Sequence, residues 1–290
     1  MSIKKETEEQ QKKPDYVAEN ETSGTTTTES SEGNDSGKQD CSTESSEETT
    51  STTKIRVHNL IILDQSGSMQ YIYRPTLAGV NETLQTIRQA QKEHPEQKHF
   101  VSLIAFNATD PRGGINYNKI YNITPADKAE DITEEHYLPC GSTPLYDAMG
   151  HAITELRSHV DKNDVVLVTI ITDGYENSSQ EYNGNAIKAL VEEMKSQNWV
   201  FTYIGANQDV DAVASSMSID NHLSFEADYN GASNMFEKEI RCRMRFFKSI
   251  CTGTIKYSRN DYFKEDDDEF KKDNDETGVK PLDSECDFSW

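Results

Sequence analysis

The sequence predicts a doubly wound α/β fold in which helices flank a mostly parallel central sheet. Four apolar runs, at residues 60–63, 100–106, 165–171 and 200–204, have the length and composition of strands that are buried on both faces. Between them, apolar residues recur every three or four positions, as they do on one face of a helix. Strands that alternate with amphipathic helices are typical of a parallel sheet.

In the first half of the chain, residues 54–57 lead into the first buried strand at 60–63. The next helix is predicted to begin at Pro75, because proline suits the first helical position, and to end near His94, just before another proline. Alternating polar and apolar residues at 115–123 predict a short edge strand after the second buried strand.

In the second half, a helix around residues 187–194 precedes the strand at 200–204, and a short helix near 209–217 precedes a weak strand at 223–225. A closing helix is predicted from about Ala232. Its buried apolar stripe is expected to consist of Phe236, Ile240, Met244 and Phe247. Its other faces carry the basic residues Lys238, Arg241, Arg245 and Lys248.

The negative charge is concentrated at the two ends of the chain. The formal net charge is −22, and residues 1–53 and 261–290 each carry −8 of it. Residues 1–53 are rich in Glu, Ser and Thr and hold few apolar side chains, so we predict a disordered tail there. We expect the folded domain, including the closing helix, at 54–250, and an acidic, flexible C-terminal tail at 251–290.

Charge and cysteine usage exclude several classes of protein. An acidic chain is a poor general binder of nucleic acid, which needs a positive surface. The five cysteines form no C-x-x-C pair, so neither a disulfide framework nor a zinc site is predicted. No stretch has the ~20 apolar residues of a membrane span, and the N-terminal residues lack the apolar core of a signal peptide. We therefore expect a soluble, cytoplasmic protein.

Oxygen-bearing side chains follow the first buried strand. Asp64, Ser66 and Ser68 alternate directly after Leu63, so an extended loop can turn all three towards one point. Ligands of open α/β sheets bind beyond the carboxyl ends of central strands, and hard oxygen ligands suit Mg²⁺ or Mn²⁺. The alternative is a serine-rich turn whose hydroxyls cap the next helix.

Two later loops carry similar residues. Thr143 stands before Pro144, where its hydroxyl could serve a metal or could cap the helix that follows. Asp173 precedes Gly174 at the end of the strand at 165–171, and an acid before glycine is also common in ordinary turns. Each loop taken alone is therefore ambiguous.

Together, the D-x-S-x-S, G-S-T-P and T-D-G segments resemble the von Willebrand factor A family over roughly residues 54–235. The resemblance implies a metal-ion-dependent adhesion site with Asp64, Ser66, Ser68, Thr143 and Asp173 as its metal-binding residues. It implies that Ser66 and Ser68 bind the metal directly, that Thr143 binds directly or through water, and that the two aspartates act largely through water. The local sequence is most similar to intracellular bacterial members, and Cys140 departs from the small or polar residue that many relatives have there.

The function implied is a metal-dependent protein-binding module, an adaptor or scaffold whose Mg²⁺ (or Mn²⁺) accepts a Glu or Asp from a protein partner. The resemblance suggests partners in AAA+ ATPase or kinase–phosphatase systems. An Mg²⁺-dependent phosphatase or other hydrolase is the alternative, and a purely structural ion is a third. We expect no enzyme, because Ser66 stands where aspartyl phosphotransferases have a second acid and because no P-loop is present.

Overall fold

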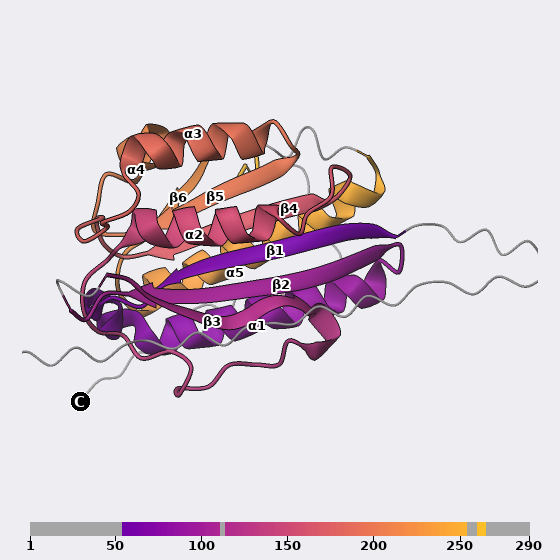
Figure 1. Cartoon of the computed structure of the whole chain (residues 1–290). Helices are drawn as coiled ribbons and strands as arrows, with labels where there is room; N and C mark the ends of the chain where they lie inside the picture. Colours follow the sequence, from indigo (N-terminus) through magenta and orange to yellow (C-terminus); the bar gives the residue numbers. More distant parts are fainter. Residues whose placement is uncertain (1–53, 111–113, 254–259, 265–290) are drawn as a thin grey trace, which may run out of the picture. The chain divides into compact units, whose positions relative to one another are not determined.

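Six strands form one mixed sheet in the order β3-β2-β1-β4-β5-β6 (Figure 1). The computed structural model describes residues 54–110, 114–253 and 260–264. The strands are β1 (Ile55–Asp64), β2 (Gln97–Asn107), β3 (Asn116–Pro125), β4 (Val165–Thr172), β5 (Trp199–Gly205) and β6 (Asn221–Ser224). All neighbours are parallel except β2 and β3. The predicted fold class is confirmed, while the N-terminal tail and residues 265–290 lie outside the described residues.

The strand β1 lies at the centre of the sheet between β2 and β4, and it includes residues 55–57 of the segment that leads into the predicted strand at 60–63. Its successive side chains enter two different hydrophobic cores. Ile61 and Leu63 pack on one face of the sheet, and Leu60 and Ile62 pack on the other. Both faces are covered, which explains the unbroken apolar sequence of the strand.

Helices cover both faces (Figure 1). The helices are α1 (Tyr73–Glu93), α2 (Leu145–Arg157), α3 (Gly184–Lys195), α4 (Val210–Ser216) and α5 (Tyr229–Cys251), with short 3-10 helices η1 (Gly67–Ile72) and η2 (Ala126–Lys128). One core contains buried residues of α1 and α5, and the other contains those of α2, α3 and α4. None of the described helices is both long and apolar enough to cross a membrane.

The start of α1 differs from the prediction. The helix begins at Tyr73, after the 3-10 helix η1, so Pro75 is its third residue rather than its first. Proline is tolerated there because the amide groups of the first helical turn have no partner within the helix.

The two edges of the sheet differ in form. β3 pairs with β2 through a register that shifts at Leu103, and β6 has only four residues. Ile123, within β3, has a φ of +48° and donates its backbone amide to the hydroxyl of Ser102.

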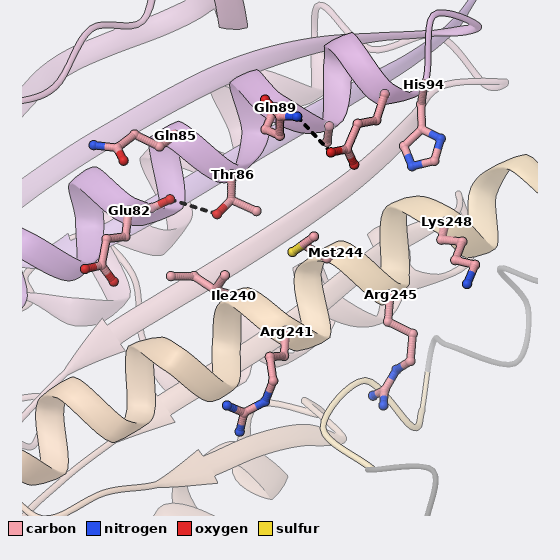
Figure 2. Close-up of a pocket in the computed structure, with 12 residues that line it drawn as sticks. Glu82, Gln85, Thr86, Gln89, His94, Ile240, Arg241, Met244, Arg245 and Lys248 are labelled. Atoms are coloured by element: carbon pink, nitrogen blue, oxygen red, sulfur yellow. Dashed lines mark hydrogen bonds between the residues drawn. The ribbon is translucent and has the colours of Figure 1, made fainter. Parts of the chain in front are cut away.

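The buried face of α5 is not the stripe predicted from its apolar residues. Phe236 and Phe247 are buried, but Met244 is exposed and Ile240 is only partly buried. Ile240 and Met244 instead line a groove of about 900 Å³ between α1 and α5 (Figure 2). The buried positions of α5 include the charged residues Glu239 and Arg243. The helix is therefore rotated about its axis relative to the orientation that the apolar stripe predicts.

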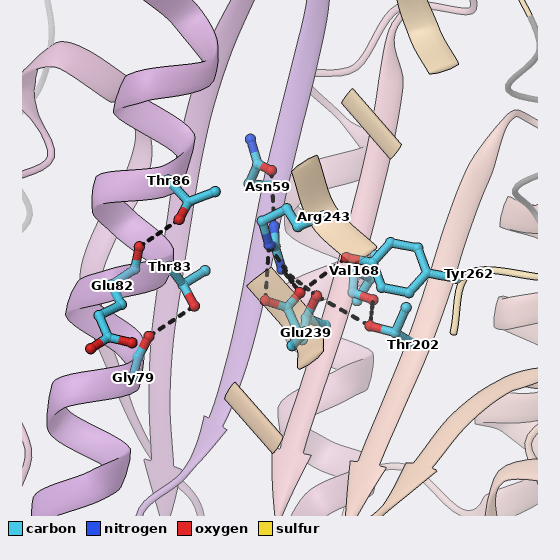
Figure 3. Close-up of polar contacts among 11 residues, drawn as sticks. Asn59, Gly79, Glu82, Thr83, Thr86, Val168, Thr202, Glu239, Arg243 and Tyr262 are labelled. Carbon is cyan, nitrogen blue, oxygen red and sulfur yellow. Dashed lines mark hydrogen bonds and ion pairs between the residues drawn. The ribbon is translucent and has the colours of Figure 1, made fainter. Parts of the chain in front are cut away.

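Arg243 connects α5 to the central strands (Figure 3). Its side chain is 0% exposed and forms an ion pair with Glu239, with Nη2 2.7 Å from Oε1. Nη1 donates to Asn59 Oδ1 of β1 at 3.1 Å, and Nη2 donates to Thr169 Oγ1 of β4 at 2.8 Å. The Tyr262 hydroxyl donates to Glu239 Oε1 at 3.0 Å. The guanidinium therefore joins one helix to two strands, and the paired carboxylate also holds residues 260–264.

We predict that Arg243→Met lowers the free energy of unfolding by about 3–5 kcal/mol, because it leaves the Glu239 carboxylate buried without its cation. Replacing both residues by apolar ones of similar volume should cost much less than the single change. Urea-induced unfolding followed by circular dichroism measures both values.

The matched control is the Glu237–Arg241 ion pair on the same helix, with the same four-residue spacing but with side chains 70% and 45% exposed. Arg241→Met should cost less than about 1 kcal/mol. Equal losses for the two arginine variants would contradict the role assigned to the buried pair.

Candidate metal centre

The five predicted residues lie at the carboxyl edge of the parallel strands. Asp64 is the last residue of β1, and Asp173 follows the last residue of the neighbouring β4. The chain leaves β1 towards β2 on one side, whereas β4 lies on the other side. Such a divergence is the place where open α/β sheets bind ligands.

Asp64 is fully buried, and both of its carboxylate oxygens accept hydrogen bonds. The backbone N–H of Ser66 donates to Oδ1 at 2.7 Å, and the hydroxyl of Thr172 donates to Oδ2 at 2.7 Å. Burial raises the pKa of the Asp64 carboxyl from 3.8 to about 7, against the opposing effect of these two donors. The site therefore holds a carboxyl group whose ionised form a nearby cation would stabilise.

Ser66, Ser68 and Asp173 form a chain of contacts beside Asp64. The two serine hydroxyl oxygens are 3.2 Å apart, and the Ser68 hydroxyl donates to Asp173 Oδ1 at 2.5 Å. Burial also raises the pKa of Asp173. Ser66 and Asp173 are buried while Ser68 is exposed, so the cluster reaches the surface at Ser68.

Backbone hydrogen bonds hold the loop of Thr143 against the loop of the serines. Gly67 N–H donates to Gly141 O at 3.0 Å, and Cys140 N–H donates to Gln65 O at 2.9 Å. Gly141 has a φ of +76°, and a Cβ there would lie 2.2 Å from Ala108 O, so this position requires glycine. The amide of Asn107 donates to Cys140 O at 2.9 Å and Cys140 Sγ at 3.3 Å.

The hydroxyls of Ser68 and Thr143 face a common position beside Gly174. A Cβ built on Gly174 would lie 3.7 Å from Ser68 Oγ and 3.8 Å from Thr143 Oγ1. The structure thus brings all five predicted residues to three adjoining loops. Their donor atoms are all oxygens, which suits a hard cation such as Mg²⁺ or Mn²⁺.

The alternative role of Thr143 as a helix cap is wrong. The residue before α2 is Pro144, and no side-chain cap forms there. The first amides of α2 donate instead to a distant segment, from Tyr146 N–H to Glu176 Oε2 at 2.9 Å and from Asp147 N–H to Ser179 Oγ at 3.0 Å. The Thr143 hydroxyl is therefore not used by the helix. The serine alternative also fails, because Ser66 makes no side-chain cap to η1.

Several positioning residues were not predicted. Thr172 holds Asp64, and Asn177 accepts the Thr143 N–H at 2.8 Å through its side chain. Asp147 accepts three consecutive backbone amides, from residues 180–182. Thr172 is the first residue of the T-D-G segment, so its position was a usable signal, whereas Asp147, Asn177 and Glu176 lie outside the three quoted segments.

Three large hydrophobic side chains are exposed on the same loops. Tyr71 follows the serines and is 87% exposed, Leu138 precedes Cys140 and is 60% exposed, and Tyr175 follows Asp173 and is 53% exposed. Aromatic side chains are enriched at protein-interaction surfaces. We refer to these three residues as the rim.

No histidine of the chain takes part in this centre. All seven lie in the described ranges, and their ring contacts are with other groups, such as Asp164 for His58 and Glu181 for His151. The arrangement therefore offers no imidazole as a general base.

The family model of the von Willebrand factor type A domain matches residues 60–238 of the chain. Curated proteins give no match.

Three solved structures illustrate the structural likeness. The pilus adhesin SpaC from Lactobacillus rhamnosus GG, in its open conformation, is 14% identical with a TM-score of 0.50, and the match covers 67% of this chain and 30% of that chain. The SpRpn10 VWA domain is 14% identical with a TM-score of 0.43, covering 63% and 94%. The manganese-loaded Plasmodium vivax TRAP protein is 15% identical with a TM-score of 0.39, covering 63% and 72%. At these identities the likeness concerns the fold alone.

We predict that the metal-free protein loses stability as the pH rises. The folded state binds the Asp64 proton more tightly than the unfolded chain does, because the pKa is about 7 in the fold and 3.8 outside it. The contribution of this group is thus fully present below the lower value and is lost as the pH rises through the higher one, by at most about 4 kcal/mol.

Asp64→Asn should flatten this part of the pH profile, since its amide can occupy the same site without titrating. Unfolding free energies of both proteins in EDTA between pH 4 and pH 8 measure the difference. Parallel profiles for wild type and variant would contradict the assignment.

Proposed function

The chain belongs to the von Willebrand factor type A domain family, and we propose that it is a divalent-metal-dependent module that captures an acidic side chain of a protein partner. Domains of this family are generally interaction modules, and they often bind a divalent metal. The proposal that this chain uses a metal to capture an acidic side chain rests on the oxygen cluster at the carboxyl ends of β1 and β4.

Each of the five residues has a distinct part in this proposal. Ser66, Ser68 and Thr143 supply neutral hydroxyl oxygens, while Asp64 and Asp173 supply negative charge from buried positions. Mg²⁺ dehydrates reluctantly and keeps several waters, so mostly neutral direct ligands leave it able to accept one more anionic oxygen. A carboxylate of the partner suits that position.

The observation that carries the proposal is the pairing of this cluster with the rim. Tyr71, Leu138 and Tyr175 belong to the same three loops as the metal-binding residues. A partner that places its carboxylate at the metal would approach the segments that carry these three side chains. A hydrolase does not need exposed apolar side chains beside its active site, so the rim favours protein binding over the hydrolase alternative.

We propose a cytoplasmic setting, with a partner from an AAA+ ATPase or kinase–phosphatase system and an origin among bacterial members of the family. The support is the local sequence around the serines and Thr143.

We predict that one Mg²⁺ or Mn²⁺ binds per chain and that Ser66→Ala/Ser68→Ala abolishes this binding in isothermal titration. The metal should also raise the free energy of unfolding of the wild type by RT ln(1 + [L]/Kd), and with it the melting temperature. The reason is that the cation offsets the negative charge of the buried carboxylates. Asp64→Asn should raise the stability of the metal-free protein and remove this gain. Unchanged titration of the double variant would refute the site.

We further predict that a peptide pool with a central Glu binds in Mg²⁺ and not in EDTA, and that the matched pool with Gln binds in neither. Tyr71→Ser/Tyr175→Ser should weaken peptide binding at least tenfold while the affinity for Mg²⁺ stays unchanged, because the rim contacts the partner and not the metal. Turnover of phosphate esters that is lost in Asp64→Ala would instead favour the hydrolase.

A further inference from the structure

A second cluster of metal-ligating side chains lies beyond the amino ends of the parallel strands, at the opposite end from the oxygen cluster. His94 and Glu96 belong to the turn between α1 and β2, just before the amino end of β2, and Cys251 is the last residue of α5. One ligand atom from each of the three lies within 4.8 Å of the others. The oxygen cluster described above follows the carboxyl end of β1, so the two groups are separated by the length of the parallel strands.

The three ligand atoms are already close to the separations of a tetrahedral metal site. Cys251 Sγ lies 3.3 Å from His94 Nδ1 and 2.7 Å from Glu96 Oε1, and the last two atoms are 3.6 Å apart. Zinc bond lengths of about 2.0–2.3 Å to nitrogen, oxygen and sulfur place tetrahedral ligands roughly 3.3–3.7 Å apart. Only the sulfur–oxygen pair is shorter than this range, and Glu96 is exposed, so its carboxylate can move outwards.

A buried glutamine holds the cysteine of this cluster in place. The buried Gln97 donates from Nε2 to Cys251 Sγ at 2.8 Å and to Phe247 O at 2.9 Å. The carbonyl of Phe247 can only accept, which is consistent with Nε2 on that side of the amide, and Oε1 is 2.9 Å from His99 Nε2. An N–H directed at a cysteine sulfur from the buried side is the kind of support that positions a metal ligand.

The turn is equally well held. His94 N–H donates to Ala90 O at 2.8 Å, and Gln97 N–H donates back to His94 O at 2.9 Å. Figure 2 shows His94 beyond the end of α1, across from the last turns of α5. Two ligands on a hydrogen-bonded turn and a third on a helix end form a small, prearranged group.

We propose that His94, Glu96 and Cys251 bind a Zn²⁺ ion that joins the end of α5 to the turn between α1 and β2. Sulfur, imidazole nitrogen and carboxylate oxygen are the usual ligands of zinc, whereas Mg²⁺ prefers oxygen alone. Binding replaces the proton of the Cys251 thiol, which passes to solvent, and no oxidation or reduction takes place. A water completes the fourth position.

A nucleophilic cysteine is the competing interpretation of the same three residues. An activated nucleophile needs neighbours that stabilise its thiolate, whereas the acidic side chain of Glu96 lies 2.7 Å from Cys251 Sγ. A bound metal ion, in contrast, drives the proton from the thiol that it binds. The geometry therefore favours a ligand over a nucleophile.

The test is a competition titration of the full chain with a zinc indicator, in a disulfide reductant and millimolar Mg²⁺, on the Ser66→Ala/Ser68→Ala background. That background removes the first metal centre, so failure of the zinc proposal and failure of the proposed function are distinguishable. We expect one Zn²⁺ per chain, and an affinity that falls more than 100-fold in Cys251→Ser, beyond the 10–100-fold typical of lost supporting contacts. His94→Gln should show the same direction of change.

The matched controls are the variants Cys41→Ser, Cys140→Ser and Cys286→Ser. Each removes another cysteine that could bind zinc, and each should keep the wild-type affinity for Zn²⁺. Co²⁺ used as a spectroscopic probe should give a thiolate-to-metal charge-transfer band that disappears only in Cys251→Ser. Equal Zn²⁺ affinity of wild type and Cys251→Ser, or loss of the band in Cys286→Ser instead, would overturn the proposal.

Discussion

The burial of the Asp64 carboxylate between β1 and β4 is the constraint on which the candidate metal centre depends. A carboxylate in this position needs donors on all sides, and the fold supplies them from two strands: the Ser66 amide after β1 and the Thr172 hydroxyl at the end of β4. These contacts set the path of the serine loop, which in turn holds the loop of Thr143 through Gly141. The hydrogen bonds that satisfy the buried Asp64 therefore help to fix the two loops on either side of it.

A second buried charge organises the other half of the molecule. Arg243 occupies a position of α5 against the sheet where an apolar side chain is usual. Glu239, Asn59 and Thr169 accept the hydrogen bonds of its guanidinium group. Breaking such a pair costs much more than an exposed one, so α5 has one preferred rotation about its axis. This rotation turns Ile240 and Met244 towards the groove beside α1 and carries Cys251 to the turn of His94.

The sequence was a good guide wherever a pattern had one physical cause. The apolar strands and the three oxygen-bearing loops follow from burial on both faces and from the motif spacing, and the structure has them there. The stripe of α5 was wrong because a charged residue is normally assigned to solvent, and the spacing of Glu239 and Arg243 does not distinguish them from the exposed pair Glu237 and Arg241. The cap of α2 was wrong because Glu176 and Ser179 reach it from a loop some 30 residues away in the chain.

The form of the sheet edges has a consequence for association. A long, flat edge strand offers unpaired backbone groups to any other extended chain and is a common start of aggregation. Here β6 has only four residues, and β3 joins the sheet through an irregular register near Ile123. Neither edge is a good template for an added strand. Self-assembly through main-chain pairing is thereby discouraged, and selectivity is left to side chains at the ends of the strands, where a single substitution can change it.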